Sequence, residues 1–156
     1  MPARLNYITA SHDSFKAMME LQQHVNNSGL EESLLGLTYL LVSRMNGCAY
    51  CIDMHSQDLR AAGETDLRID LVSVWEEVDI YSERERAAFA WAESVTRVSQ
   101  THVPDEVFAP ARQQFSEAEL VKLNLAVVTI NSWNRFAISF RSEPGHYKPP
   151  AQKTAS

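Results

Sequence analysis

The residues best suited to chemistry lie in one short stretch, Asn46 to His55, which reads Asn-Gly-Cys-Ala-Tyr-Cys-Ile-Asp-Met-His. Cys48 and Cys51 are the only cysteines among the 156 residues, and His55 follows the second by four positions. If the stretch is helical, each residue turns by about 100°, so the three side chains fall within an arc of roughly 60°. Two thiols one turn apart can close a short disulfide, and an imidazole one turn further can move a proton. The spacing therefore predicts a redox site.

The helix that would carry these residues begins where a thiol is most easily activated. Asn46-Gly47 is typical of a turn or cap, and Gly63 is typical of a helix end, which predicts a helix running to about Ala62. Free N–H groups and the positive dipole end of a helix N-terminus favour a thiolate over a thiol. We therefore expect the pKa of the Cys51 thiol to lie below the ~8.5 of a free cysteine.

Two other interpretations of the cysteine pair are possible: the cysteines are simply small buried residues, or they form half of a zinc site. Structural zinc is usually held by four ligands, and the chain has no further cysteine to supply. Two subunits could share four sulfurs. In a reducing compartment, however, a lone Cys-x-x-Cys pair is more typical of redox chemistry, and we predict no metal and no cofactor.

Composition indicates one soluble globular domain. The chain is 45% apolar and 22% charged, with a net charge of −6 and a pI of about 5.3. There is no basic run, so nucleic acid is not an expected partner. No apolar stretch approaches the ~20 residues of a membrane span, so no membrane is expected either. The N-terminus lacks the apolar core of a signal peptide, which predicts a cytoplasmic protein.

Periodicity and capping signals predict an all-α, single-domain bundle of about six to seven helices, with the Cys-x-x-Cys pair at a helix N-terminus within a helical hairpin. The expected domain covers residues 13–141, between an extended N-terminal arm at 1–12 and a C-terminal tail at 142–156. The sequences at Ser82 and Ser116 match capping boxes. The expected helices lie near residues 14–27, 31–45, 47–62, 66–75, 82–99, 104–115 and 116–140.

The last expected helix, which reaches Phe140, is apolar on several faces. A small domain rarely buries such a helix fully. We therefore expect a subunit interface to cover part of it.

The stretch Asn46 to His55 and the following Arg60-Ala61-Ala62-Gly63-Glu64 resemble the alkylhydroperoxidase D (AhpD) family, within the carboxymuconolactone decarboxylase superfamily. The likeness continues through Ser82-Glu83-Arg84-Glu85-Arg86-Ala87 and Asn131-Ser132-Trp133-Asn134-Arg135, so it covers most of the chain. The resemblance implies an all-α fold and a homo-oligomer, trimeric or hexameric. It also implies a peroxidase that acts without metal or haem.

By the same resemblance, Cys51 attacks an organic hydroperoxide, Cys48 closes a disulfide with the resulting sulfenic acid, and His55 relays the activating proton. A dithiol, which in relatives is a protein-bound lipoyl group, would reduce the disulfide again. The expected function is a thiol-dependent hydroperoxide reductase with antioxidant activity.

The chain departs from the family pattern at two positions. The usual relay glutamate stands twelve residues before the first cysteine, where this chain has Gly36, and a histidine often precedes the second cysteine, where it has Tyr50. Glu31 and Glu32 are not simply equivalent to the missing acid. We therefore expect weak peroxidase activity. The alternatives are a redox-sensing or interaction module of the same fold and a decarboxylase-type enzyme in which the cysteines are incidental.

Overall fold

The computed structural model describes residues 1–150, which form nine α-helices and one 3₁₀ helix and contain no strand. Seven of the helices have six or more residues and correspond to the seven expected from the sequence, so the all-α prediction is confirmed. In chain order the elements are α1 Tyr7–Ala10, α2 His12–Asn26, α3 Glu32–Asn46, α4 Ala49–Ala61, α5 Asp66–Leu71, η1 Val72–Glu77, α6 Glu83–Thr96, α7 Val98–Thr101, α8 Asp105–Gln114 and α9 Glu117–Phe140.

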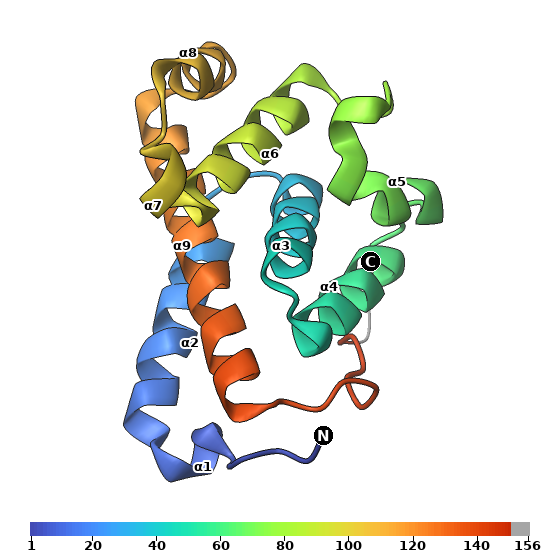
Figure 1. The fold of residues 1–156 in the computed structure, drawn as a ribbon, viewed down its shortest axis with the longest axis vertical. Helices are drawn as coiled ribbons and strands as arrows, with labels where there is room; N and C mark the ends of the chain where they lie inside the picture. The colour runs from blue at the N-terminus through green and yellow to red at the C-terminus, as the bar shows by residue number, and fades with distance from the viewer. Residues whose placement is uncertain (151–156) are drawn as a thin grey trace, which may run out of the picture.

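Helix α3 is the centre of the bundle. Its sequence is apolar almost all round, and Leu37, Leu40 and Val42 have no exposed surface. It packs against α4, α6 and α9, and Figure 1 shows it between α9 on one side and α4 on the other. A helix that is apolar on every face is stable only where neighbours cover every face. The buried helix α3 therefore supports α4, the helix that carries the cysteines, which packs against it.

Both predicted capping boxes are confirmed, and they set the starts of α6 and α9. The Ser82 hydroxyl accepts the Glu85 N–H at 3.2 Å, and the Glu85 carboxylate accepts the Ser82 N–H at 2.8 Å. Ser116 and Glu119 make the same pair of bonds at 3.2 and 2.8 Å. Each box satisfies two amide donors that a helix start leaves without intrahelical partners.

The prediction of an extended arm over the first dozen residues was wrong. The side chain of Asn6 accepts the N–H groups of Ile8 and Thr9, at 3.0 and 3.4 Å, which starts the short helix α1. The predicted helix over 82–99 instead ends at Thr96, and α7 follows after Arg97. Of the predicted tail, residues 151–156 lie outside the described residues. Within residues 1–150, we find no helix that is both long and apolar enough to cross a membrane.

Buried amides join the end of α3 to α9. Asn134 has no exposed surface; its oxygen accepts from Asn46 at 2.8 Å, and its nitrogen donates to the Ser43 hydroxyl at 3.1 Å. Asn46 also donates to Asn131 at 3.0 Å. Since Asn46 lies just before Gly47 and the cysteine turn, this network holds that turn against α9.

We expect Asn134→Leu to lower the free energy of unfolding by about 2–4 kcal/mol, because it removes the Asn134 partner of the buried Ser43 hydroxyl and one of the two hydrogen bonds that Asn46 donates. Urea denaturation of the purified variant measures the change. Val98→Ala, at a position of α7 that is 52% exposed, is the control and should stay within about 0.5 kcal/mol of wild type. Equal losses in the two variants would contradict a specific role of the amide network.

Candidate redox site

The turn between α3 and α4 places the cysteines at the N-terminus of α4, as predicted. Gly47 ends α3 with a φ of 69°, in the left-handed region that glycine adopts without steric cost. The N–H of Cys48 then donates to the Ser43 carbonyl at 2.9 Å, which closes the end of α3. Cys48 itself is the N-cap of α4. The hairpin therefore presents both cysteines within the first turn of a helix.

Cys48 and Cys51 are joined by a disulfide, with their Cα atoms 5.3 Å apart. Both residues are buried, at 1% and 2% exposure, and Tyr50 and Ala137 pack around them. The N–H of Cys51 donates to the Cys48 sulfur at 3.3 Å, so one of the free amides at the start of α4 already faces a cysteine sulfur. Such an amide stabilises negative charge on sulfur.

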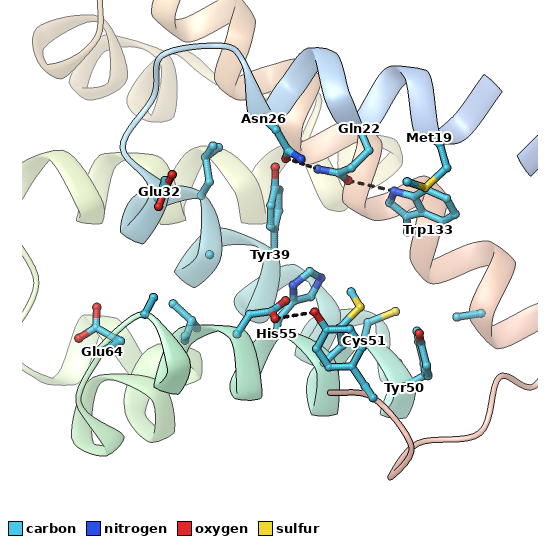
Figure 2. Close-up of a pocket in the computed structure, with 18 of the residues that line it drawn as sticks. Met19, Gln22, Asn26, Glu32, Tyr39, Tyr50, Cys51, His55, Glu64 and Trp133 are labelled. Carbon is cyan, nitrogen blue, oxygen red and sulfur yellow. Dashed lines mark hydrogen bonds between the residues drawn. The ribbon is translucent and has the colours of Figure 1, made fainter. Parts of the chain in front are cut away.

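His55 lies one turn after Cys51 on α4 and faces the ring of Tyr39 from α3, with ring centroids 5.3 Å apart (Figure 2). Its Nε2 atom is buried and has no hydrogen-bond partner among residues 1–150. Burial lowers the pKa of His55 to about 4. The imidazole is therefore neutral at pH 7, with a lone pair available to accept a proton.

The position of the missing relay acid lies opposite α4, where a side chain would have little room. A Cβ atom at Gly36 would come within 2.8 Å of Leu59 Cδ2. Glu31 is committed elsewhere, because its carboxylate pairs with Arg84 at 2.7 Å, and this hydrogen bond lowers the pKa of Glu31. The structure thus places neither Gly36 nor Glu31 to pass a proton to His55.

Arg44 lies four residues before Cys48, close enough in sequence for its positive charge to influence the thiols. Its guanidinium instead donates to the Asp70 carbonyl at 2.8 Å and to the Ser73 hydroxyl at 3.3 Å. It therefore ties α3 to the segment around α5 and η1, and the dipole of α4 remains as the positive influence on the cysteines.

Sequence reasoning missed a contact between the C-terminal tail and α4. The Tyr147 hydroxyl donates to Asp58 at 2.6 Å, and the Gly145 N–H donates to Asp53 at 2.8 Å. Burial raises the pKa of Asp58, and the bond from Tyr147 opposes that rise. No periodicity or cap marks these residues in the sequence. The pairing brings a carboxyl and a phenol from distant parts of the chain to the surroundings of His55 and Cys51.

These residues line one open cavity of about 1000 Å³, which is bordered by residues of α1, α2, α3, α4, α9 and the tail. Figure 2 shows Cys51 and His55 on α4 facing Met19 and Trp133 across this space. Cys51 lines the cavity, whereas Cys48 lies behind it. Trp133 is partly buried against the core and also forms part of the cavity wall. Trp75 and Trp91 are buried in the core.

The depressed pKa of His55 predicts a pH-dependent stability. The unfolded chain takes up a proton at His55 below its ordinary pKa of 6.5, and the folded chain does so only near 4. As the pH falls from 6.5 to 4, the free energy of unfolding should therefore fall, by at most about 3 kcal/mol. Urea denaturation across this range should show a flatter profile for His55→Gln than for wild type. His24→Gln, at an exposed position, should retain the wild-type slope; parallel profiles for all three proteins would refute the assignment.

The fold and sequence also identify the family. The sequence profile of the Carboxymuconolactone decarboxylase family matches residues 12–94, more than half of the chain. The protein therefore belongs to that family, and its fold is AhpD-like. A crystal structure from Agrobacterium tumefaciens, of a protein of unknown function named as a candidate antioxidant defence protein AhpD, is similar with a TM-score of 0.91. It is 42% identical, and the match covers 94% of this chain and 100% of that one.

Two sequence relatives extend the comparison. Uncharacterized protein YdfG of Bacillus subtilis strain 168 is 38% identical over 139 residues, which cover 89% of this chain and 95% of YdfG. Alkyl hydroperoxide reductase AhpD of Bradyrhizobium diazoefficiens is 45% identical over 56 residues, 35% of this chain and 31% of that protein. The similarity to the relative whose name states a peroxide reaction, AhpD of Bradyrhizobium diazoefficiens, is thus limited to a segment of 56 residues.

Proposed function

We propose that this protein is a thiol-dependent hydroperoxide reductase that cycles the Cys48–Cys51 disulfide with a dithiol reductant. The observation that carries the proposal is the pair itself. Two cysteines close a disulfide at a helix N-terminus, and Cys51 lines a cavity large enough to admit a substrate. The segment shared with an alkyl hydroperoxide reductase supports the same reaction.

The reaction proceeds in three balanced steps. In the reduced protein, the Cys51 thiolate attacks the terminal oxygen of ROOH, the O–O bond breaks, and RO⁻ takes a proton to leave as ROH. The Cys48 thiol then attacks the Cys51 sulfenic acid, which forms the disulfide and releases water. Finally a dithiol, such as a lipoyl group on a protein, gives two electrons and two protons to the disulfide and becomes a cyclic disulfide.

The positions of the two sulfurs support this order of roles. Cys51 lines the cavity and can meet a substrate, whereas Cys48 lies behind it and accepts the Cys51 N–H. His55, which is neutral and one turn along α4, is the base that takes the thiol proton from Cys51 and returns it to the leaving alkoxide. A base with a pKa of about 4 is weak at pH 7, so the activation step should be slow.

Stopped-flow oxidation of the reduced protein by an organic hydroperoxide tests the assignment. Wild type should lose two titratable thiols per chain and release one alcohol. Cys48→Ser should stop at a Cys51 sulfenic acid, which dimedone labelling and mass spectrometry detect. Two thiols that remain titratable after excess hydroperoxide would overturn the proposal.

A redox-sensing module is the second candidate, and one observation favours it. His55 has no hydrogen-bonded carboxylate among the described residues, so the proton relay of the family is incomplete. In this role the disulfide would change assembly, and turnover with any dithiol would be negligible. Light scattering of reduced and oxidised protein distinguishes the two roles, because a peroxidase need not change its oligomeric state with each cycle.

We also propose that the chain forms a homo-oligomer, as a trimer or hexamer, with α9 at the subunit contact. Val121 and Val128 lie two turns apart on this helix and are 70% and 43% exposed. Large apolar side chains that recur on one helix face are typical of a surface covered by a partner. Val121→Glu together with Val128→Glu should therefore shift the mass measured by light scattering toward the monomer, and an unchanged mass would contradict this contact.

A further inference from the structure

The cavity beside Cys51 is far larger than hydrogen peroxide requires. Its volume is about 1000 Å³, whereas a water molecule occupies about 30 Å³ of liquid and hydrogen peroxide has one heavy atom more. Cavities of this size usually bury drug-sized ligands. At Gly36 no side chain projects from α3, and Leu59 of α4 packs against this position of the lining instead.

The wall opposite Cys51 is aromatic. The rings of Phe15 and Trp133 meet edge to face with centroids 6.0 Å apart, and Tyr7 lies 6.4 Å from Phe15. Figure 2 shows Trp133 and Met19 across the cavity from Cys51. Such rings contact another ring favourably in tilted or offset geometry, and methionine adapts to irregular shapes. This wall fits a ligand with a flat, ring-containing body.

On the aromatic side, the amides of Gln22 and Asn26 and the indole of Trp133 are paired with each other, whereas the buried Tyr39 hydroxyl has no hydrogen-bond partner among the described residues. Gln22 donates to Asn26 at 2.8 Å and accepts the Trp133 indole N–H at 3.0 Å, as the dashed lines in Figure 2 show. A ligand polar group placed there would compete with these bonds. The polar end of a ligand is therefore better placed toward Cys51 and His55, and its body toward the rings.

The charged residues of the lining are acidic. Glu32, Asp58 and Glu64 line the cavity, and no lysine or arginine is among the described residues that do so. Burial raises the pKa of Asp58, which shows that negative charge is disfavoured at that place. A negative charge on the ligand would be repelled by these carboxylates, and Arg68, which pairs with Glu64 at 3.0 Å, lies outside the lining. The lining thus favours a neutral ligand.

We infer that the substrate is a neutral organic hydroperoxide with a bulky ring-containing body, which the cavity selects over hydrogen peroxide and over hydroperoxides that carry a carboxylate. The inference rests on the proposed function and specifies its substrate. The peroxy group meets Cys51, the O–O bond breaks as described above, and the ring-bearing product is a neutral tertiary or secondary alcohol.

Rate constants for oxidation of the reduced protein test this selectivity. The three substrates are cumene hydroperoxide, its 4-carboxylate derivative and hydrogen peroxide. The rate constant for each substrate is divided by the rate constant of the same oxidant with free cysteine. This division removes intrinsic reactivity. The normalised rate for cumene hydroperoxide should exceed each of the others by at least tenfold, as burial of a ring adds favourable binding.

A second readout needs no turnover. The product alcohol 2-phenyl-2-propanol should bind the disulfide form in calorimetry, and its 4-carboxylate derivative should bind at least tenfold more weakly. Met19→Trp, which adds bulk to the lining, should weaken binding of the alcohol at least tenfold. Lys16→Trp, one turn away on α2 and outside the lining, should bind like wild type.

The outcomes separate the two claims. Equal normalised rates and no measurable binding of the alcohol would overturn the substrate assignment and leave the peroxidase function standing. If the alcohol binds but none of the three oxidants consumes the thiols, the peroxidase function fails and the substrate assignment fails with it.

Discussion

Replacing Cys51 by serine is expected to lower the rate of hydroperoxide turnover by at least a thousandfold. A serine hydroxyl beside a neutral histidine does not ionise appreciably at pH 7, and it cannot be oxidised to the sulfenic acid on which the cycle depends. Cys51 is the cysteine that lines the cavity, and no other thiol of the described residues does so. Steady-state consumption of cumene hydroperoxide with dihydrolipoamide as reductant measures the loss.

Cys48→Ser is the matched control, because it removes the other sulfur of the same disulfide. This variant should still reduce one equivalent of hydroperoxide at a rate near that of wild type, and then stop for lack of a resolving thiol. Replacing Cys48 or Cys51 by alanine would also test how the side chain packs at that position, since both cysteines are buried. If Cys51→Ser consumed one equivalent and Cys48→Ser did not, the roles of the two cysteines would be reversed.

Gly36→Glu is expected to raise kcat/KM for hydrogen peroxide by about tenfold or more, which is below the roughly 10²–10⁴-fold that well-placed general acid–base catalysis contributes. Gly36 and Tyr39 lie one turn apart on α3, where Leu59 and His55 of α4 face them. A carboxylate added there would approach His55 and raise its pKa from about 4 toward neutrality, since opposite charge favours the imidazolium.

Gly36→Gln separates acid chemistry from bulk, since it has nearly the same size and cannot ionise. Both variants must displace the Leu59 side chain from the 2.8 Å approach of a Cβ at this position, so both should lose similar stability in urea denaturation. Both should also reduce the space left for cumene hydroperoxide. Equal peroxide rates in the two variants would show that a carboxylate at this point of α3 does not reach the reaction.

The fold could be predicted from sequence because its signals are local. The capping boxes at Ser82 and Ser116 and the glycine after α3 each specify a helix end through residues three or four positions apart. The cysteine pair is equally local, since one helical turn brings Cys48 to Cys51. Asn6, by contrast, starts α1 through a single side chain in a segment with little apolar periodicity, and the prediction there failed.

The cavity could not be predicted because its parts come together through packing of distant segments. Trp133 is a large aromatic residue of the kind usually found in a core. Its contacts with Phe15 and Gln22, which place it in the wall of the cavity, join segments that are far apart in the sequence. Tyr147 and Asp58 are 89 residues apart in sequence. The absence of a side chain at Gly36 was visible in the sequence as a missing acid, whereas the packing of Leu59 against this position could be seen only in the structure.

Consumption of cumene hydroperoxide with dihydrolipoamide present decides whether the Cys48–Cys51 pair reduces hydroperoxides catalytically. We expect one alcohol formed per dithiol oxidised, over many turnovers, with the reaction lost in Cys51→Ser. Hydroperoxide that remains unconsumed by wild type, or turnover that survives in Cys51→Ser, would contradict it.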